Sequence, residues 1–321
     1  MLDLDRGPVY ARCGHLLPRI ASAELDCVSD ALALLLAARG VSDVLTPFGC
    51  DWRFDLVEAG GRAGPALPPS DQDDRLAERT GWRPLWTMVG PASFADWHRT
   101  LQDGNALAVV ADAYHLPWVP YAGREHMEHG FVVEGLDGNT AHVVDPYDNV
   151  TEWGRATPRS LQTSLDVLQP ALPGARWCVL CPAAAGEPIA AASMIVDNAS
   201  AIMASVANYG LFVEQYQNLD EPALQHLALQ TWLLYRSRAL HARWLAAPAT
   251  AGPHPAAADR FRPVTQAWQR AAEGAYLALR RVRGGRAVPA GAMQSLRTAV
   301  NAELAVAAEL LGPAGKAGPP C

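Results

Sequence analysis

The sequence changes character near residues 183–191, "AAAGEPIAA". Before this stretch, strand-like runs of apolar residues alternate with segments at helical spacing, whereas only helical spacing continues after it. A chain of 321 residues is long enough for two domains with separate cores. We therefore expect an α+β domain over residues 1–185, an all-α domain over 190–312, and a disordered tail over 313–321.

The expected elements follow from periodicity, caps and breakers. In the first domain, residues 73–81 and 93–104 read as helices, 58–71 as a Gly/Pro-rich surface loop, and 105–118 as a buried strand leading into a loop. Residues 176–182 read as the last strand. In the second domain we expect four helices, near residues 190–216, 221–246, 256–282 and 290–311.

A β-hairpin is predicted between His129 and Asp145. Two apolar runs flank the turn signal Asp137-Gly138-Asn139. A loop with an odd number of residues, centred on Asp137, would pair His129 with Asp145. A two-residue Asp137-Gly138 turn would shift the pairing of the two strands by one residue, and the two side chains would then lie on opposite faces of the hairpin. The sequence leaves both registers open. A histidine that is oriented by a carboxylate supplies two of the three members of a nucleophilic triad. The pair of His129 and Asp145 therefore needs only a nucleophile.

The candidate nucleophile is Cys27, in the first turn of a predicted helix. Asp26 is the expected N-cap, apolar residues from Ala31 to Leu36 give a core face, and Gly40 is the expected stop. A helix N-terminus is where the dipole and unpaired N–H groups stabilise a thiolate. The alternative for Cys27 is a small buried apolar residue.

Four separated motifs resemble a known family. They are Asp26-Cys27 before an apolar helix, "VLTPFGCDW" (44–52), "DAYHLPWVPYAGREHMEHGFVVEGLDG" (112–138) and Asp145-Pro146. In this order they resemble the N-terminal domain named for the butirosin-biosynthesis acyltransferase, a papain-like domain close to the bacteriocin-processing peptidases. The resemblance covers about residues 10–182. It implies a papain-like fold with Cys27 as nucleophile, His129 as base and Asp145 as its orienter, followed by a helical C-terminal domain.

The sequence departs from the papain-like pattern at the oxyanion site. A glutamine usually precedes the cysteine, but residues 19–25 read "RIASAEL". The candidate donors are the backbone N–H of Cys27 and the side chains of Ser22 and His15, and one missing donor costs about two to three orders of magnitude in rate. Before the base, the loop residues Tyr114, Trp118 and His126 are candidates for lining the substrate site. We expect His129, rather than His126, to be the base.

The resemblance implies an acyl or aminoacyl transferase of natural-product biosynthesis. The acyl group would come from a thioester on an acyl or peptidyl carrier protein, form an acyl-enzyme on Cys27, and pass to a small amine acceptor in amide bond formation. The phosphopantetheine arm belongs to the donor, so the protein itself needs no cofactor. The alternatives are a cysteine peptidase or thioesterase, which would release free acid without an amine, and a non-catalytic binding module that has kept the fold.

Two further clusters have competing interpretations. His126, His129, Cys178 and Cys181 form two pairs with the composition of a zinc site, but Cys178-x-x-Cys181 lies in a predicted strand, where i and i+3 point to opposite faces. We therefore expect no metal. The second cluster lies at the end of a predicted helix and consists of Arg280, Arg281, Arg283 and Arg286. It is either a solvated helix end, where positive charge interacts favourably with the helix dipole, or a binding surface for an acidic carrier protein.

Composition narrows the partners and the compartment. The net charge is -7 and the arginines form no long basic tract, which disfavours nucleic acid and an anionic membrane as partners. The first 15 residues show no apolar signal core, and no run reaches the roughly 18 apolar residues of a membrane span. We expect a cytoplasmic bacterial protein with free thiols at its six scattered cysteines, and we leave homo-oligomerisation open.

Overall fold

The chain forms two compact units. The computed structural model describes residues 13–20, 22–59, 61–90, 93–186, 191–247, 255–289 and 291–312. Unit 1 comprises Met1–Phe48 and Asp73–Glu187, and unit 2 comprises Gly49–Gln72 and Pro188–Cys321. Unit 1 is mixed α/β and unit 2 is mainly helical, which confirms the predicted change from α+β to helical structure. The predicted tail over 313–321 lies outside the described residues.

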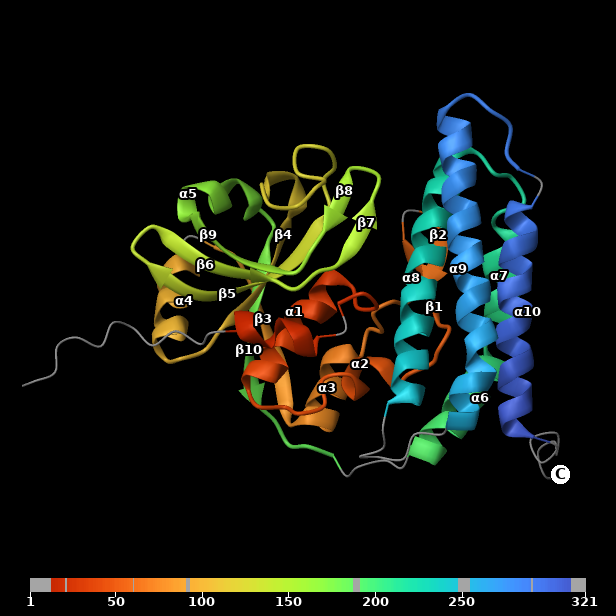
Figure 1. The fold of residues 1–321 in the computed structure, drawn as a ribbon, viewed down its shortest axis with the longest axis horizontal. Coiled ribbons are helices and arrows are strands. Elements are labelled where there is room, and N and C mark those ends of the chain that lie inside the picture. The colour runs from red at the N-terminus through yellow and green to blue at the C-terminus, as the bar shows by residue number, and fades with distance from the viewer. Residues whose placement is uncertain are drawn as a thin grey trace, which may run out of the picture. The chain divides into compact units, whose positions relative to one another are not determined.

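Unit 1 is built on a six-stranded antiparallel sheet with the strand order β3-β10-β4-β5-β6-β9 (Figure 1). The strands are β3 (Trp82–Met88), β4 (Leu107–Asp112), β5 (Glu128–Asp137), β6 (Thr140–Asp145), β9 (Arg159–Ser164) and β10 (Arg176–Pro182). A separate ribbon pairs β7 (Asn149–Thr151) with β8 (Gly154–Ala156). The predicted strand over 105–118 is confirmed as β4, and the one over 176–182 as β10.

The helices of unit 1 pack on both faces of the sheet. They are α1 (Cys27–Ala38), α2 (Thr46–Gly49), α3 (Gln72–Thr80), α4 (Ser93–Gln102) and α5 (Leu165–Leu168), with the 3-10 helices η1 (Gly14–Arg19), η2 (Ala113–His115) and η3 (Gln169–Ala171). Val109 and Phe131, paired on β4 and β5, share a core with Trp97 of α4. Gly130, the next residue of β5, faces α1 instead. The central strands are apolar on both sides because both faces are covered.

Unit 2 contains five helices among its described residues, where the sequence predicted four. They are α6 (Ala191–Ala204), α7 (Val206–Glu214), α8 (Glu221–Ala246), α9 (Pro255–Arg283) and α10 (Ala292–Leu311). The first predicted helix is interrupted at Ser205, whose backbone leaves the helical region at φ -90°, ψ 10°. The Ser205 hydroxyl donates to the carbonyl of Ala201 at 2.9 Å, a back-bond that bends helices.

The domain boundary expected from the sequence is wrong for residues 49–72. This segment belongs to unit 2, and the predicted surface loop over 58–71 contains a hairpin of β1 (Leu56–Ala59) and β2 (Arg62–Pro65). Trp52 and Phe54 are fully buried, and Phe54 stacks on Tyr209 of α7 at 3.8 Å between ring centroids. The segment leaves unit 1 because its aromatic side chains complete the core of the helical unit.

A buried charge pair marks the centre of unit 2. Arg238 of α8 donates to Glu303 of α10 at 2.6 Å, and neither side chain is more than 1% exposed. Glu303 also accepts hydrogen bonds from the indole N–H groups of Trp52 and Trp268. The buried carboxylate is therefore fully paired, as a charge without water must be. Within the described residues, no helix combines the length and the apolar character needed to cross a bilayer.

Candidate active site

Cys27 occupies the first position of α1, as the sequence predicts. Asp26 is the N-cap, and its carboxylate accepts from the backbone N–H groups of Val28 and Ser29 at 3.0 Å each. Gly40 follows the helix with φ +81°, a conformation that favours glycine. The Cys27 thiol is partly exposed, and its Sγ lies 3.9 Å from the carbonyl oxygen of Glu128. The nucleophile candidate thus sits where a helix dipole favours negative charge.

A glycine allows α1 to approach β5 at backbone distance. A Cβ added at Gly130 would lie 2.5 Å from the carbonyl oxygen of Cys27 and 2.9 Å from the Cα of Val28. Real Cβ atoms do not approach backbone so closely, so no other residue fits without displacing the helix. Gly130 therefore sets how near the first turn of α1 comes to its neighbour His129.

The hairpin follows neither of the two registers considered from the sequence. Asp137 pairs with Thr140, so the turn residues are Gly138 and Asn139 rather than Asp137 and Gly138. Gly138 has φ +55° and Asn139 does not have positive φ, which is the pattern of a type II′ turn. The turn therefore starts one residue later than the two-residue alternative.

A β-bulge then sets which face carries Asp145. A ladder running unbroken from the turn would set Asp145 opposite Val132, and so on the other face from His129. The register shifts at Glu134, where β5 has an extra residue, and Val132 pairs with Val144 instead. As a result His129 and Asp145 lie on the same face of the hairpin, as diagonal neighbours.

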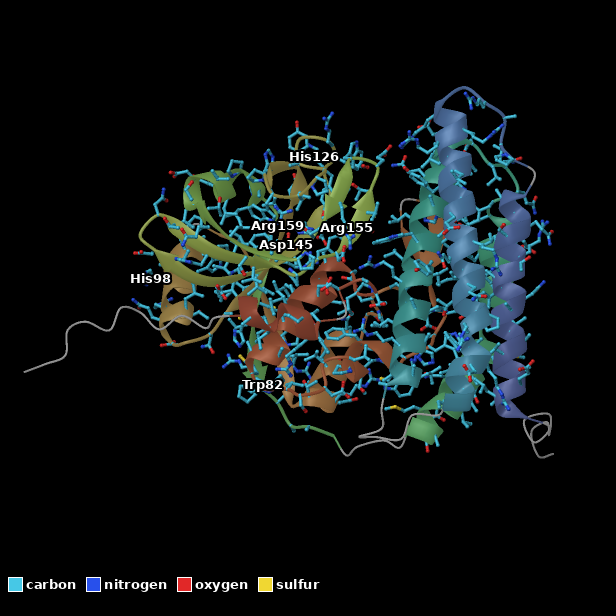
Figure 2. The ribbon with its side chains drawn as sticks, viewed as in Figure 1. Trp82, His98, His126, Asp145, Arg155 and Arg159 are labelled. Carbon is cyan, nitrogen blue, oxygen red and sulfur yellow. The ribbon has the colours of Figure 1, made fainter. Side chains whose placement is uncertain are left out.

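His129 and Asp145 form a buried pair. Their Nε2 and Oδ2 atoms are 2.8 Å apart, and the side chains are 1% and 5% exposed. Asp145 also accepts from the indole N–H of Trp118 at 2.9 Å and from the backbone N–H of Tyr147 at 3.1 Å. Three donors hold the carboxylate in place, so it fixes the orientation of the imidazole. In Figure 2, Asp145 lies at the centre of unit 1.

The sequence reasoning missed Tyr121. Its hydroxyl oxygen lies 2.9 Å from His129 Nδ1, the ring nitrogen that Asp145 does not occupy. The Tyr121 side chain is buried, and this burial, together with the nearby Cys27, Tyr147 and Asp145, raises its pKa far above the ordinary value. The hydroxyl therefore stays protonated, as a neutral hydrogen-bonding group beside the nucleophile and the base.

The electrostatic surroundings favour a protonated His129. Burial acts to lower its pKa, but the charge and hydrogen bond of Asp145 and the hydrogen bond and charge of Cys27 outweigh burial and raise the pKa to about 10. At neutral pH the imidazolium would donate from Nε2 to Asp145 and from Nδ1 to the Tyr121 hydroxyl.

The three residues expected to line the substrate site separate into two groups. Trp118 reaches the triad candidates through Asp145, and its ring contacts Phe131 at 5.4 Å between centroids. Tyr114 stacks instead on His126 at 4.2 Å, and His126 pairs with Asp112. His126 therefore belongs to a different cluster from His129. Among the oxyanion candidates, His15 is exposed on η1, whereas Ser22 is buried.

The four-ligand zinc alternative is not formed. Both ring nitrogens of His129 contact other side chains, and His126 contacts Asp112. Cys178 is buried in β10 opposite Ala108, and burial raises the pKa of its thiol well above the usual range. Cys181, three residues on, points to the opposite face. The five cysteines among the described residues have free thiols, as predicted.

Comparisons with known proteins give no assignment. The sequence matches no protein-family profile, and a search among curated proteins finds no relative.

Proposed function

We propose that the protein is a cysteine acyltransferase with a papain-like catalytic unit, in which Cys27 is the nucleophile, His129 the base and Asp145 its orienter. The observation that carries the proposal is the 2.8 Å contact between the buried His129 Nε2 and Asp145 Oδ2, with Cys27 at the start of the helix that packs against β5 beside His129. A cysteine at a helix N-terminus, packed on an antiparallel sheet that carries the histidine, supports the papain-like assignment.

In the first half of the proposed reaction, the Cys27 thiolate attacks the carbonyl carbon of a thioester. The new C–S bond forms as the bond to the donor sulfur breaks, and the leaving thiolate takes the Nδ1 proton of His129. In the second half, an amine attacks the acyl-enzyme and gives its proton to His129, while Cys27 leaves as a thiolate. Charge and protons balance, and no redox step is needed.

Burial of the site supports transfer over hydrolysis. His129, Asp145 and Tyr121 are almost entirely buried, and the rings of Tyr121 and Tyr147 lie against that of His129. A site from which water is largely excluded slows hydrolysis of a reactive acyl-enzyme and gives an amine time to react. A carrier-bound thioester donor and a small amine acceptor are the substrates that the family resemblance implies.

The arginine cluster at the end of α9 is the proposed landing surface for an acidic carrier protein. All four side chains are exposed, so their charge can steer an acidic partner. Part of the cluster also stabilises its own helix end, because Arg283 pairs with Glu221 at 3.1 Å and Arg281 donates to the carbonyl of Ala287. Arg280 also donates to the hydroxyl of Tyr276 at 3.4 Å, so removal of charge tests docking best at Arg286.

The first prediction is that Cys27 is the one cysteine acylated by a thioester. Incubation with acyl-pantetheine thioesters should add one acyl mass to the wild type, and Cys27→Ala should show no adduct. Cys181→Ala is the matched control, because Cys181 is also a partly exposed free thiol. It should be acylated at the wild-type rate. Normal acylation of Cys27→Ala, by intact mass, would remove the nucleophile from the proposal.

The fate of the adduct separates the reaction classes. A panel of primary amines added to the isolated acyl-enzyme should accelerate loss of the adduct and give an amide. Release of free acid at the same rate with and without amines would favour the thioesterase or peptidase. A wild type that neither acylates nor reacts with iodoacetamide faster than a model thiol would favour the non-catalytic binding module.

A further inference from the structure

Three metal-ligating side chains converge outside the triad candidates. Asp112 ends β4, His115 lies on η2, and His126 precedes β5. Asp112 Oδ2 is 2.6 Å from His126 Nδ1 and 4.0 Å from His115 Nε2. One ligand atom from each residue lies within 4.8 Å of the other two, and no other such group occurs among the described residues. His126 is labelled near the edge of unit 1 in Figure 2.

The surrounding contacts hold two of the three groups in position. Asp112 uses its Oδ1 to accept the backbone N–H of Tyr114 at 3.0 Å, which leaves Oδ2 for the histidines. The Tyr114 ring stacks on the His126 imidazole, nearly parallel at 11°. A carboxylate that is oriented by a backbone hydrogen bond presents its other oxygen in a fixed direction, as a metal ligand does.

We propose that Asp112, His115 and His126 form a three-ligand site for a divalent transition-metal ion of the zinc class. Two imidazoles and one carboxylate suit Zn²⁺, whereas Mg²⁺ and Ca²⁺ prefer oxygen ligands alone. Ligand atoms around tetrahedral zinc are about 3.3 Å apart, from bonds of about 2.0–2.1 Å. The 2.6 Å and 4.0 Å separations lie on either side of this value, so side-chain rotations satisfy it. Water completes the coordination.

A simple ion pair does not account for the whole arrangement. The contact between Asp112 and His126 needs no metal, but it does not explain why His115 also turns its Nε2 toward the same carboxylate oxygen. Asp112 and His126 also bracket residues 113–125, the segment that contains His115 and that carries Tyr121 to His129 and Trp118 to Asp145. A bound ion would join the two ends of this segment. The proposed metal site does not rest on the proposed acyl transfer, because His126 pairs with Asp112 whereas His129 pairs with Asp145.

Zinc binding can be measured without any activity assay. Chelator-treated protein is titrated with Zn²⁺ in competition with a chromophoric chelator. We expect one equivalent to bind to the wild type, and Asp112→Asn and His126→Gln to weaken binding at least about tenfold through loss of one ligand. Mg²⁺ should not compete. His98→Gln is the matched control, because His98 is an exposed histidine of α4 well away from His126 (Figure 2). It should bind zinc as the wild type does.

Folding and adventitious binding are controlled in the same experiment. His126 is 67% exposed in its side chain, so His126→Gln should leave the circular dichroism spectrum unchanged. Zinc should raise the melting temperature of the wild type and of His98→Gln, but not of His126→Gln. Equal zinc binding by the wild type and by the triple variant Asp112→Asn, His115→Gln, His126→Gln would overturn the site, as would a wild type that binds no zinc.

Discussion

The two ring nitrogens of His129 have different partners, and this difference defines its proposed role. Nε2 is held by Asp145, while Nδ1 meets the Tyr121 hydroxyl. A base must exchange its proton at one nitrogen while the other keeps the ring in place. In the proposed role, Nδ1 therefore transfers the proton and Nε2 keeps the ring oriented.

Substitutions at the two ends of this pair should differ in severity. His129→Ala should lower the rate of Cys27 acylation by about two to four orders of magnitude, because the group that protonates the leaving sulfur is lost. Asp145→Asn should lower it less, because the imidazole remains although its orientation weakens. His98→Ala is the control and should react normally. Stopped-flow or intact-mass rates with one thioester donor measure all three, and a fully active His129→Ala variant would refute the assignment.

Tyr121→Phe tests the positioning of the imidazole. The substitution removes one hydrogen bond to the ring, which corresponds to about a tenfold loss of acylation rate at a net value near 1 to 1.5 kcal/mol. The loss should fall on kcat rather than KM. Because Tyr121 accepts from the protonated ring, the His129 pKa should also fall from about 10, as measured by NMR titration. An unchanged titration together with an unchanged rate would limit Tyr121 to packing.

The sequence predicts some of these residues and not others for a physical reason. Cys27 stands out through its helix cap, and His129 and Asp145 through the hairpin that brings them together. Tyr121 carries no such signal, because it lies in a loop whose path depends on contacts across the sheet. The same limit applies to Asp112, His115 and His126, which meet only when the loop closes.

At the scale of elements, the bulge in β5 decides whether the proposed site can form. Without the extra residue at Glu134, Asp145 would face away from His129. Glu134 accepts a hydrogen bond from the backbone N–H of Cys13, a contact between residues 121 positions apart. Local sequence patterns predict strands and turns, but a bulge stabilised from so far along the chain lies beyond them. This is why the hairpin was predicted and its register was not.

Gly130→Ala should separate α1 from β5. The new Cβ meets backbone rather than a mobile side chain, so overpacking should cost about 1 to 3 kcal/mol in the free energy of unfolding. Alkylation of Cys27 by iodoacetamide should slow as the helix start moves away from His129. Gly90→Ala is the matched control, since an added Cβ there meets no described atom within 4 Å. Equal unfolding midpoints and alkylation rates for both variants would show that the contact is not tight.

At the scale of the whole molecule, the two units are not consecutive stretches of sequence. The segment 49–72 leaves unit 1 after Phe48 and supplies Trp52 to the core of unit 2, beside Phe261 and the Glu303 carboxylate. A composition shift locates the boundary near 183–191, because it marks where strands stop. The composition does not indicate that residues 49–72 belong to unit 2, because this depends on tertiary contacts with residues about 150 to 250 positions away in the chain.

The two units contain buried histidines with opposite pKa shifts. His129 in unit 1 has a raised pKa, so its stabilisation is present below pH 6.5 and is lost as pH rises through about 10. His241 in unit 2 has a pKa lowered from 6.5 to about 4, because burial outweighs the opposing hydrogen bond to the Gly49 carbonyl; the charge of Arg238 lowers the pKa further and that of Asp51 opposes it. Its stabilisation is present above pH 6.5 and is lost as pH falls toward 4.

Unit 2 should therefore be the acid-sensitive part of the molecule. Between pH 7 and 5 the unfolded chain protonates His241 while the folded unit keeps it neutral, which should lower the free energy of unfolding by about 2 kcal/mol. Urea titrations followed by circular dichroism at 222 nm at several pH values measure this dependence of stability on pH.

The variant His241→Asn tests the source of the acid sensitivity. Its amide can still donate to the Gly49 carbonyl, which His241 Nδ1 contacts at 2.8 Å, but it cannot titrate. His241→Asn should be less stable than the wild type at pH 7 but should lose much less stability on acidification. A small pH dependence should remain because the pKa of His226 is also lowered. His98→Asn controls for an exposed histidine and should keep the full wild-type slope, whereas a full slope in His241→Asn would show that acid sensitivity arises elsewhere.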